Sequence, residues 1–215
     1  NGVLWSLSYE WWFYMLFFLL AKNINQKELN KWVYIIVITA AASYLIYPFM
    51  VNRLAMYFAI WWIGVKFADT YISGEAFTLK SIMPYAYVLF TITALLGLNF
   101  YLNFEYTKIY TYPLVAYPFI ELRHFIFSIM VMFGAVIWHN WNWIGFNQLF
   151  GIFKHLAPCS YVIYISHEYL VVKATYLNFI NHKVIEYGIY IILMIIFSYL
   201  LEVVVYNKIR KVLLG

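Results

Sequence analysis

The segment Trp5–Ala21 reads WSLSYEWWFYMLFFLLA and holds one charged residue, Glu10, among aromatic and aliphatic side chains. Crossing the hydrocarbon core of a membrane as a helix takes about 20 mostly apolar residues. A charged side chain at the bilayer centre costs about 2.5–3.5 kcal/mol, and less near the interface. The segment therefore predicts a membrane-spanning helix, and Glu10 near its start is a candidate functional group.

The composition of the whole chain is that of a membrane protein. Of the 215 residues, 66% are hydrophobic and only 11% are charged, whereas soluble domains are about 25% charged. We attribute the formal charge of +5 to lysines facing the cytoplasm, because no basic, aromatic-interleaved module for nucleic-acid binding is visible. A single cysteine, Cys159, excludes an internal disulfide.

Apolar runs of helical length recur along the chain. They do not alternate as the strands of a membrane barrel would, and helices satisfy their own backbone in lipid. We therefore predict an all-α, polytopic transmembrane helical bundle, formed as one domain over residues 1–215. The seven predicted spans are Trp5–Ala21, Trp32–Val51, Leu54–Ala68, Ile82–Leu102, His124–Trp138, Ser160–Leu177 and Tyr187–Tyr206.

The basic residues predict the orientation of these spans. Alternating the seven spans places nine lysines and arginines on the side that holds the C-terminal tail, and five on the opposite side. Basic residues favour the cytoplasmic side. The sequence thus predicts a multi-pass protein of the plasma (inner) membrane with a cytoplasmic C-terminus. The start of the first span, with Ser6, Ser8 and Glu10, is expected at the outer face.

Polar side chains at the start of the first span form the first candidate site. Ser6, Glu10 and Tyr14 are spaced i, i+4, i+8 and so share one helix face, whereas Ser8 points elsewhere unless it precedes the helix. Glu10 could orient or deprotonate a substrate hydroxyl, with the Ser and Tyr hydroxyls as further contacts. The alternative is structural: a serine caps the helix and Glu10 is a first-turn acid facing the helix dipole.

A second cluster lies in the sixth predicted span. Tyr164, His167 and Glu168 fall on one side of a helix, shortly after Ser160 and Tyr161. A neutral imidazole can carry protons or accept a hydrogen bond. The alternative is a His–Glu pair that satisfies itself between helices.

Arg53 begins the third predicted span on the predicted outer side. It could pair with a carboxylate, Glu10 among them, or extend its guanidinium to the lipid headgroups. No metal-binding motif is present: the histidines lack metal-ligand spacing, and neither H-E-x-x-H nor C-x-x-C occurs.

Several of these residues also carry a family resemblance. LWSLSYEWWFYMLFFLL, residues 4–20, resembles the W-S-L-S-x-E-x-x-F-Y signature of the membrane-bound acyltransferase-3 family. LAPCSYVIYISHEYLVV, residues 156–172, resembles the family's L-G-x-x-S-Y-x-x-Y-L-x-H segment, departing from it at Ala157-Pro158 and Ser166. Arg53 matches the start of an R-x-x-x-F-x-x-G helix, although its spacings to Phe58 and Gly64 are longer.

The resemblance implies an activity and its partners. Members have about ten helices, take an acyl group from cytoplasmic acetyl-CoA and pass it to a hydroxyl of an extracytoplasmic polysaccharide or glycolipid. The family's signature histidine, the residue most often assigned as its catalytic base, and its paired arginines lie in the first helices. This chain is therefore predicted to be the C-terminal portion of such an enzyme and to lack that base. By resemblance we predict Glu10 and His167 as catalytic groups, with no metal and no bound cofactor. The predicted substrate-binding residues are Ser6, Ser8, Tyr14, Arg53, Ser160, Tyr161 and Tyr164.

Two other functions stay open at this point. A transporter, flippase or polymerase-type protein for lipid-linked glycans could line a path with Glu10, Arg53 and His167. Such proteins often carry inverted repeats, and no repeat is visible here. The chain could also be an inactive fragment that lacks its partner helices.

Overall fold

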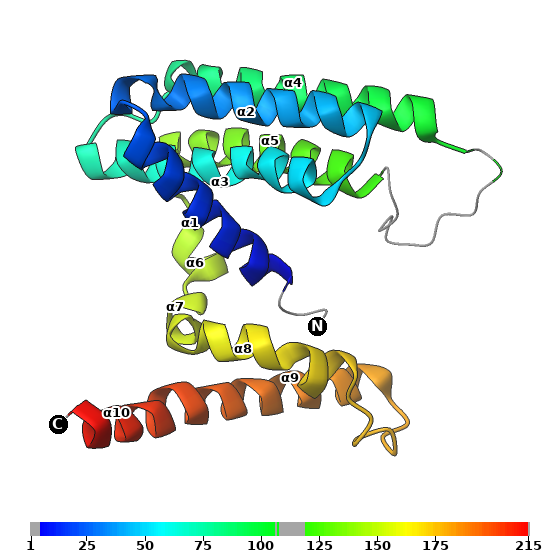
Figure 1. Cartoon of the computed structure of the whole chain (residues 1–215). Helices are drawn as coiled ribbons and strands as arrows, with labels where there is room; N and C mark the ends of the chain where they lie inside the picture. Colours follow the sequence, from blue (N-terminus) through cyan, green and yellow to red (C-terminus); the bar gives the residue numbers. More distant parts are fainter. Residues whose placement is uncertain (1–4, 106, 108–118, 215) are drawn as a thin grey trace. The chain divides into compact units, whose positions relative to one another are not determined.

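The computed structural model describes residues 5–105, 107 and 119–214, and no strand occurs among them. The chain groups into two compact units. The bundle unit is Tyr9–Ile144, and the hairpin unit joins Asn1–Ser8 to Gly145–Gly215. Both are built of helices (Figure 1), so the predicted all-α fold is confirmed.

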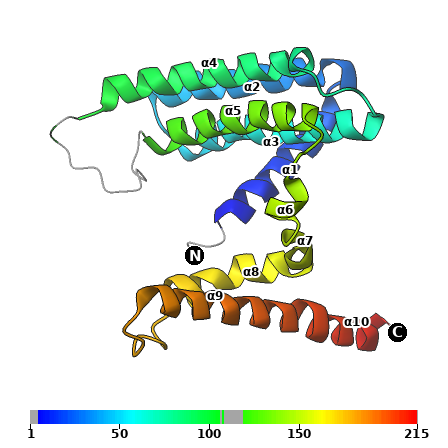
Figure 2. The ribbon, with the colours of Figure 1, turned by 180° about the vertical axis from the view of Figure 1, so that it is seen from behind.

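The bundle unit consists of long helices that run in alternating directions from α2 to α5 (Figures 1 and 2). The starts of α2 and α4 therefore lie at the same end as the ends of α3 and α5. We call this end the lysine-rich end, after Lys27, Lys31, Lys66 and Lys80. The helices are α1 (Trp5–Asn23), whose residues up to Ser8 belong to the hairpin unit, α2 (Gln26–Ile46), α3 (Met50–Ser73), α4 (Leu79–Asn103) and α5 (Phe119–Asn140).

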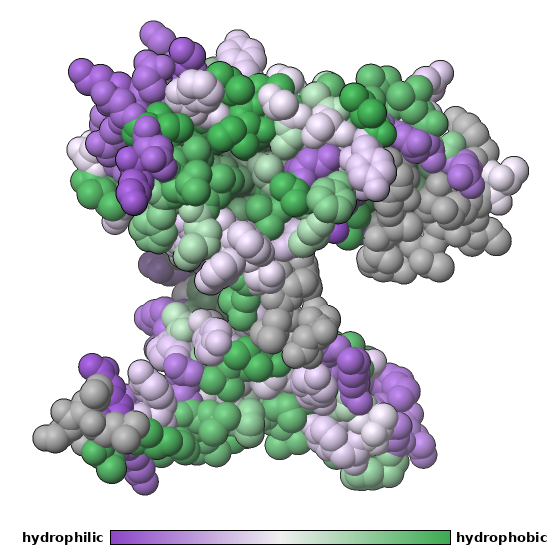
Figure 3. All heavy atoms as spheres, in the orientation of Figure 1, coloured by the Kyte–Doolittle hydropathy of each residue, from purple (hydrophilic) through white to green (hydrophobic). Residues whose placement is uncertain are grey.

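One face of each helix forms the core of this unit. In α5 the buried residues after Glu121 are Phe125, Ile129, Met132 and Val136, which is the spacing of a single helix face. The opposite face is also apolar: Phe127 and Met130 are 63% and 66% exposed. Figure 3 shows hydrophobic residues over the outer surface of the helices and hydrophilic residues gathered at the lysine-rich end. An apolar exterior suits a helix bundle that lies in lipid.

Local signals set where these helices begin and end. α2 starts after Asn25, whose side chain accepts a hydrogen bond from Lys27 N at 3.1 Å, an N-cap interaction. α2 ends before Pro48, because a residue that precedes proline avoids helical backbone, and Tyr47 is extended. Gly74 ends α3 in the left-handed conformation with φ +70°, which glycine adopts without strain.

The hairpin unit contains shorter helices and one long one. Its elements are α6 (Phe146–Phe150), α7 (Phe153–Leu156), the 3-10 turn η1 (Ala157–Cys159), α8 (Ser160–His167), the π-helical turn η2 (Glu168–Val172), α9 (Lys183–Tyr199), the π-helical turn η3 (Leu200–Val205) and α10 (Tyr206–Leu214). α8 packs on α9, and α9 continues through η3 into α10 (Figure 1).

Tyr190 fastens the connection between α8 and α9. Its hydroxyl accepts a hydrogen bond from Leu177 N at 3.1 Å and donates one to Glu186 Oε1 at 3.1 Å. The other carboxylate oxygen of the buried Glu186 lies 2.8 Å from Lys183 Nζ. One tyrosine thus holds the 173–182 segment against α9 and satisfies a buried acid.

Four helices of the described chain are long and apolar enough to cross a membrane: Gln26–Ile46, Leu79–Asn103, Phe119–Asn140 and Lys183–Arg210. α1 matches the first predicted span to within two residues. α3 contains the third predicted span but extends beyond Leu54–Ala68 at both ends, so the predicted bounds of that span are wrong. Charged residues, Trp and Tyr lower the hydropathy of both helices. The predicted second span is wrong at its end, since α2 stops at Ile46 and not at Val51.

The sixth predicted span, Ser160–Leu177, is wrong as a continuous helix. Helical structure ends at Val172. The π-helical turn closes there with Lys173 N donating to Glu168 O at 2.7 Å, and the Tyr176 hydroxyl donates to Leu170 O at 2.9 Å. A helix end must satisfy its last carbonyls, and these two bonds do so.

Candidate functional site

The predicted face of α1 is present in the structure. The Tyr14 hydroxyl donates to Glu10 Oε1 at 3.3 Å, and both side chains are exposed. The helix already includes Trp5, and no acid lies in its first turn. Neither Ser6 nor Ser8 is therefore the N-cap residue, and Glu10 is not a first-turn acid. The structural alternative for these residues is wrong.

Ser6 and Tyr164 meet within the hairpin unit. Ser6 Oγ lies 2.5 Å from the Tyr164 hydroxyl, and either group can donate. The structure thus joins two predicted substrate-binding residues that are far apart in the sequence. Ser8 lies inside α1 and is exposed, and helix geometry places it on a different face from Ser6.

The geometry of His167 fixes its tautomer. His167 Nδ1 lies 2.6 Å from the carbonyl oxygen of Tyr164. A carbonyl only accepts hydrogen bonds, so Nδ1 carries the proton and donates it. In the neutral ring Nε2 then carries no proton, and this nitrogen can accept a proton from a hydroxyl.

The residues around His167 are arranged differently from the predicted His–Glu pair. Glu168 forms its ion pair with Lys173. Tyr161 is exposed, and Ser160 Oγ donates to Ala157 O at 2.9 Å. Glu168 is therefore engaged with a cation on the following turn, and the imidazole of His167 donates its hydrogen bond to the backbone carbonyl of Tyr164.

Arg53 pairs with Glu121, not with Glu10. In the bundle unit Arg53 Nε lies 2.9 Å from Glu121 Oε1, and the side chains are 32% and 3% exposed respectively. A buried carboxylate needs a partner charge and hydrogen bonds. Arg53 supplies the charge, whereas Glu121 Oε2 has no hydrogen-bond partner among the described residues. Arg53 therefore compensates a buried acid, rather than reaching only for headgroups.

Aromatic and imidazole groups extend this pair. The Tyr57 hydroxyl lies 2.7 Å from His124 Nδ1, and the Arg53 guanidinium lies 5.8 Å from the centre of the Tyr57 ring. α3 and α5 thus share a polar cluster of Arg53, Tyr57, Glu121 and His124 inside an apolar bundle. Ionisable groups in such a setting are often functional.

Sequence reasoning missed Glu121 as a site residue because it assigned residues 103–123 to a connection. The helix begins at Phe119 instead. Phe125, Ile129 and Met132 repeat at helical spacing, and the same spacing extended back by one turn reaches Glu121. The sequence pattern could therefore have placed Glu121 on the buried face of this helix. Within the described residues, no group of three or more His, Cys, Asp or Glu side chains could hold a metal ion.

In a comparison with protein families, the model of the acyltransferase-3 family, described as an acyltransferase domain, matches residues 1–203. The match covers most of the chain and includes α1, α3 and α8. No curated protein and no solved structure matches the chain.

Proposed function

Since the chain belongs to the acyltransferase-3 family, we propose that it is a membrane-bound O-acyltransferase. It takes an acetyl group from cytoplasmic acetyl-CoA and passes it to a hydroxyl of an extracytoplasmic polysaccharide or glycolipid. The protein lies in the plasma (inner) membrane with its C-terminus in the cytoplasm. The observation that carries the chemical part is the tautomer of His167, which leaves Nε2 as a proton acceptor.

The reaction needs a base for the acceptor hydroxyl. In our proposal His167 Nε2 takes that proton as the hydroxyl oxygen attacks the thioester carbonyl carbon. The carbon–sulfur bond then breaks, CoA leaves as the thiolate, and the thiolate takes up the proton that His167 Nε2 received, which returns the imidazole to its neutral form. The Tyr164 carbonyl holds the imidazole in the required tautomer throughout.

Glu10 has a separate role in the proposal, that of a contact for the acceptor. Its exposed carboxylate accepts hydrogen bonds from the hydroxyls of the acceptor sugar, as it already does from Tyr14. Ser6, Ser8, Tyr14, Arg53, Ser160, Tyr161 and Tyr164 remain proposed contacts for substrate. Carboxylate–hydroxyl bonds are charge-assisted and stronger than neutral ones, which suits recognition of a sugar.

The test is transfer of labelled acetyl from acetyl-CoA to an envelope polysaccharide fraction by membranes that contain the full chain. His167→Asn keeps an N–H donor near the position of Nδ1 and removes the basic nitrogen. We expect it to lower the rate by about 10²–10⁴-fold, the usual contribution of a general base. His155→Asn, which changes an exposed histidine of the same unit, is the matched control and is expected to keep the rate.

Two results contradict the proposal. Transfer that is no faster than in membranes without the protein overturns the activity. A normal rate in His167→Asn overturns the role of His167 while leaving the activity in place. Glu10→Gln, measured in the same assay, separately tests the acceptor contact, which should raise KM for the polysaccharide.

A further inference from the structure

One continuous helical ribbon of the hairpin unit is longer than the hydrocarbon core of a membrane is thick. α9, η3 and α10 run on without a break (Figure 1), and Lys183–Arg210 within them is 28 residues long. At about 1.5 Å per residue this span rises about 40 Å, whereas the hydrocarbon core is about 30 Å thick. With Lys183 at one edge of the core, the opposite edge falls near Val203, and α10 lies beyond it.

Charged side chains keep α10 out of the hydrocarbon. Lys208 and Arg210 are exposed, and neither forms an ion pair among the described residues. A long span can fit a thinner core by tilting, but that tilt would draw Lys208 into lipid, where a charge is costly. The headgroup layer is about 5–7 Å thick on each side, which is about five residues of helix. Lys208 therefore lies at the height of the lipid phosphates.

The exposed apolar side chains of α10 share one side of the helix. Tyr206, Ile209 and Val212 are spaced i, i+3, i+6, and they are 54%, 50% and 85% exposed. Helix geometry places Lys208 and Arg210 outside this apolar face. A helix with one apolar and one basic face is typical of segments that lie at a membrane surface, so α10 suits the headgroup layer in which its depth places it.

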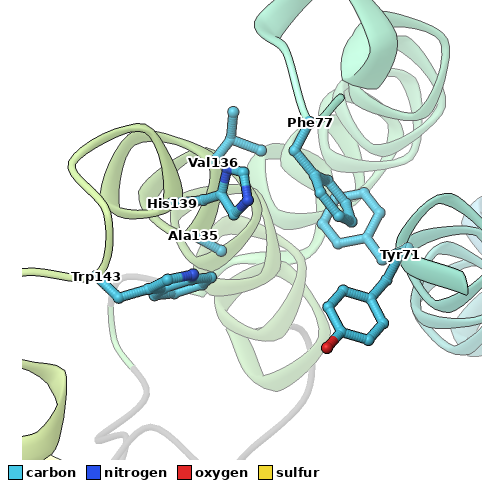
Figure 4. Close-up of a pocket in the computed structure, with 7 residues that line it drawn as sticks. Tyr71, Phe77, Ala135, Val136, His139 and Trp143 are labelled. Carbon is cyan, nitrogen blue, oxygen red and sulfur yellow. The ribbon is translucent and has the colours of Figure 1, made fainter. Parts of the chain in front are cut away.

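The pocket of the bundle unit differs from this surface. It encloses about 200 Å³, and its lining holds no lysine or arginine. Figure 4 shows His139 between Phe77 and Trp143, and its ring centre lies 5.3 Å and 5.7 Å from theirs. The rings of the pocket thus pack on one another, whereas α10 presents apolar and basic side chains outward.

The charge of α10 selects the lipids that suit it. The sequence of residues 203–214 holds three basic residues and no acid, and Glu202 before it is half-buried. Basic residues at this height are attracted by anionic headgroups. We propose that α10 docks on anionic phospholipids of the adjacent leaflet. Lys208 and Arg210 bind the headgroup phosphates, and the apolar face contacts the boundary between headgroups and acyl chains.

The test is amide hydrogen exchange of the full chain in lipid nanodiscs, read on peptides of α9 and of α10. In discs of equal parts phosphatidylcholine and phosphatidylglycerol, the α10 amides should exchange more slowly than in phosphatidylcholine alone. The expected difference is up to about 5-fold for each of the two basic residues. Salt at about 1 M should remove most of it, because salt screens exposed charges.

Three variants isolate the two charges. Lys208→Gln/Arg210→Gln removes both, so its α10 should exchange equally in the two lipids. Lys208→Arg/Arg210→Lys keeps both and should behave like the wild type. Lys154→Gln, which changes an exposed lysine of the same unit, is the matched control for lost charge and should keep the difference. Equally slow exchange of α9 in every variant shows that the compared proteins are folded.

The proposal is overturned if α10 exchanges at one rate in both lipids, or if Lys208→Gln/Arg210→Gln keeps the wild-type difference. A rate that is equally slow in both lipids means that the apolar face alone holds α10, and a rate that is equally fast means that α10 lies in water. Inorganic phosphate added to phosphatidylcholine discs should not slow the exchange. If it acts as well as phosphatidylglycerol, α10 binds free anions and not a membrane surface. None of these outcomes depends on acyl transfer.

Discussion

Breaking the Arg53–Glu121 pair should destabilise the bundle by an amount that depends on which of the two residues is replaced. Removing one partner of a buried ion pair costs about 3–5 kcal/mol, because the other charge stays buried. In Glu121→Gln the remaining charge is on Arg53, which is 32% exposed and can reach water, so we expect a loss of about 3 kcal/mol. In Arg53→Met the remaining charge is on the Glu121 carboxylate, which is 3% exposed and cannot reach water, so we expect a loss of about 5 kcal/mol.

The double variant Arg53→Met/Glu121→Leu isolates the interaction. It replaces both charges by apolar groups, which is often close to neutral for a buried pair. Its cost should therefore be well below the sum of the single losses, a coupling of more than about 1 kcal/mol. The assay is the free energy of unfolding of the full chain in mixed micelles, titrated with dodecyl sulfate and followed by tryptophan fluorescence.

An exposed ion pair provides the matched control. Lys31 and Glu28 lie 3.3 Å apart with side chains 68% and 54% exposed, so Glu28→Gln should cost less than about 1 kcal/mol. The reasoning is refuted if Arg53→Met and Glu121→Gln cost the same and the double variant costs their sum. That result would mean that the two charges are solvated independently.

Two further predictions concern the hairpin unit. Tyr190→Phe removes the hydroxyl that bonds Leu177 N and Glu186, so it should lower the free energy of unfolding by about 1–3 kcal/mol and speed proteolysis within residues 173–182. The control is Tyr187→Phe at the exposed neighbouring tyrosine, which should change neither quantity. Equal cleavage of the two variants would contradict the prediction. In a Cys159→Ser background, Lys208→Cys should react with a membrane-impermeant thiol reagent only from the cytoplasmic side, and labelling from outside would reverse the proposed orientation.

The helices of the bundle unit were largely predictable, and their ends were not. Apolar runs located α1 to α5 because hydrophobicity decides which segments leave water. The ends depend on single residues: the second predicted span ran through Pro48 because its apolar character continues to Val51. The geometric restriction that proline places on Tyr47 outweighs that hydrophobicity.

The partner of Arg53 could not be found from the sequence. Glu10 and Glu121 are both acids near predicted helix starts, and only the packing of α3 against α5 brings one of them to Arg53. Arg53 compensates the buried charge of Glu121 in the first turn of α5. A pattern of residues along one helix shows which face is buried, but not which helix will cover it.

The segment 160–182 has the largest consequence for topology. α8 and η2 together span Ser160–Val172, and 13 helical residues rise about 20 Å, short of a hydrocarbon core of about 30 Å. If the segment turned back, the C-terminal tail would move to the outer side, and the basic residues would divide eight to six instead of nine to five. The stronger asymmetry favours a segment that crosses, with the irregular residues after Val172 completing the path. The side from which a cysteine at position 208 reacts therefore reports whether 160–182 crosses the membrane.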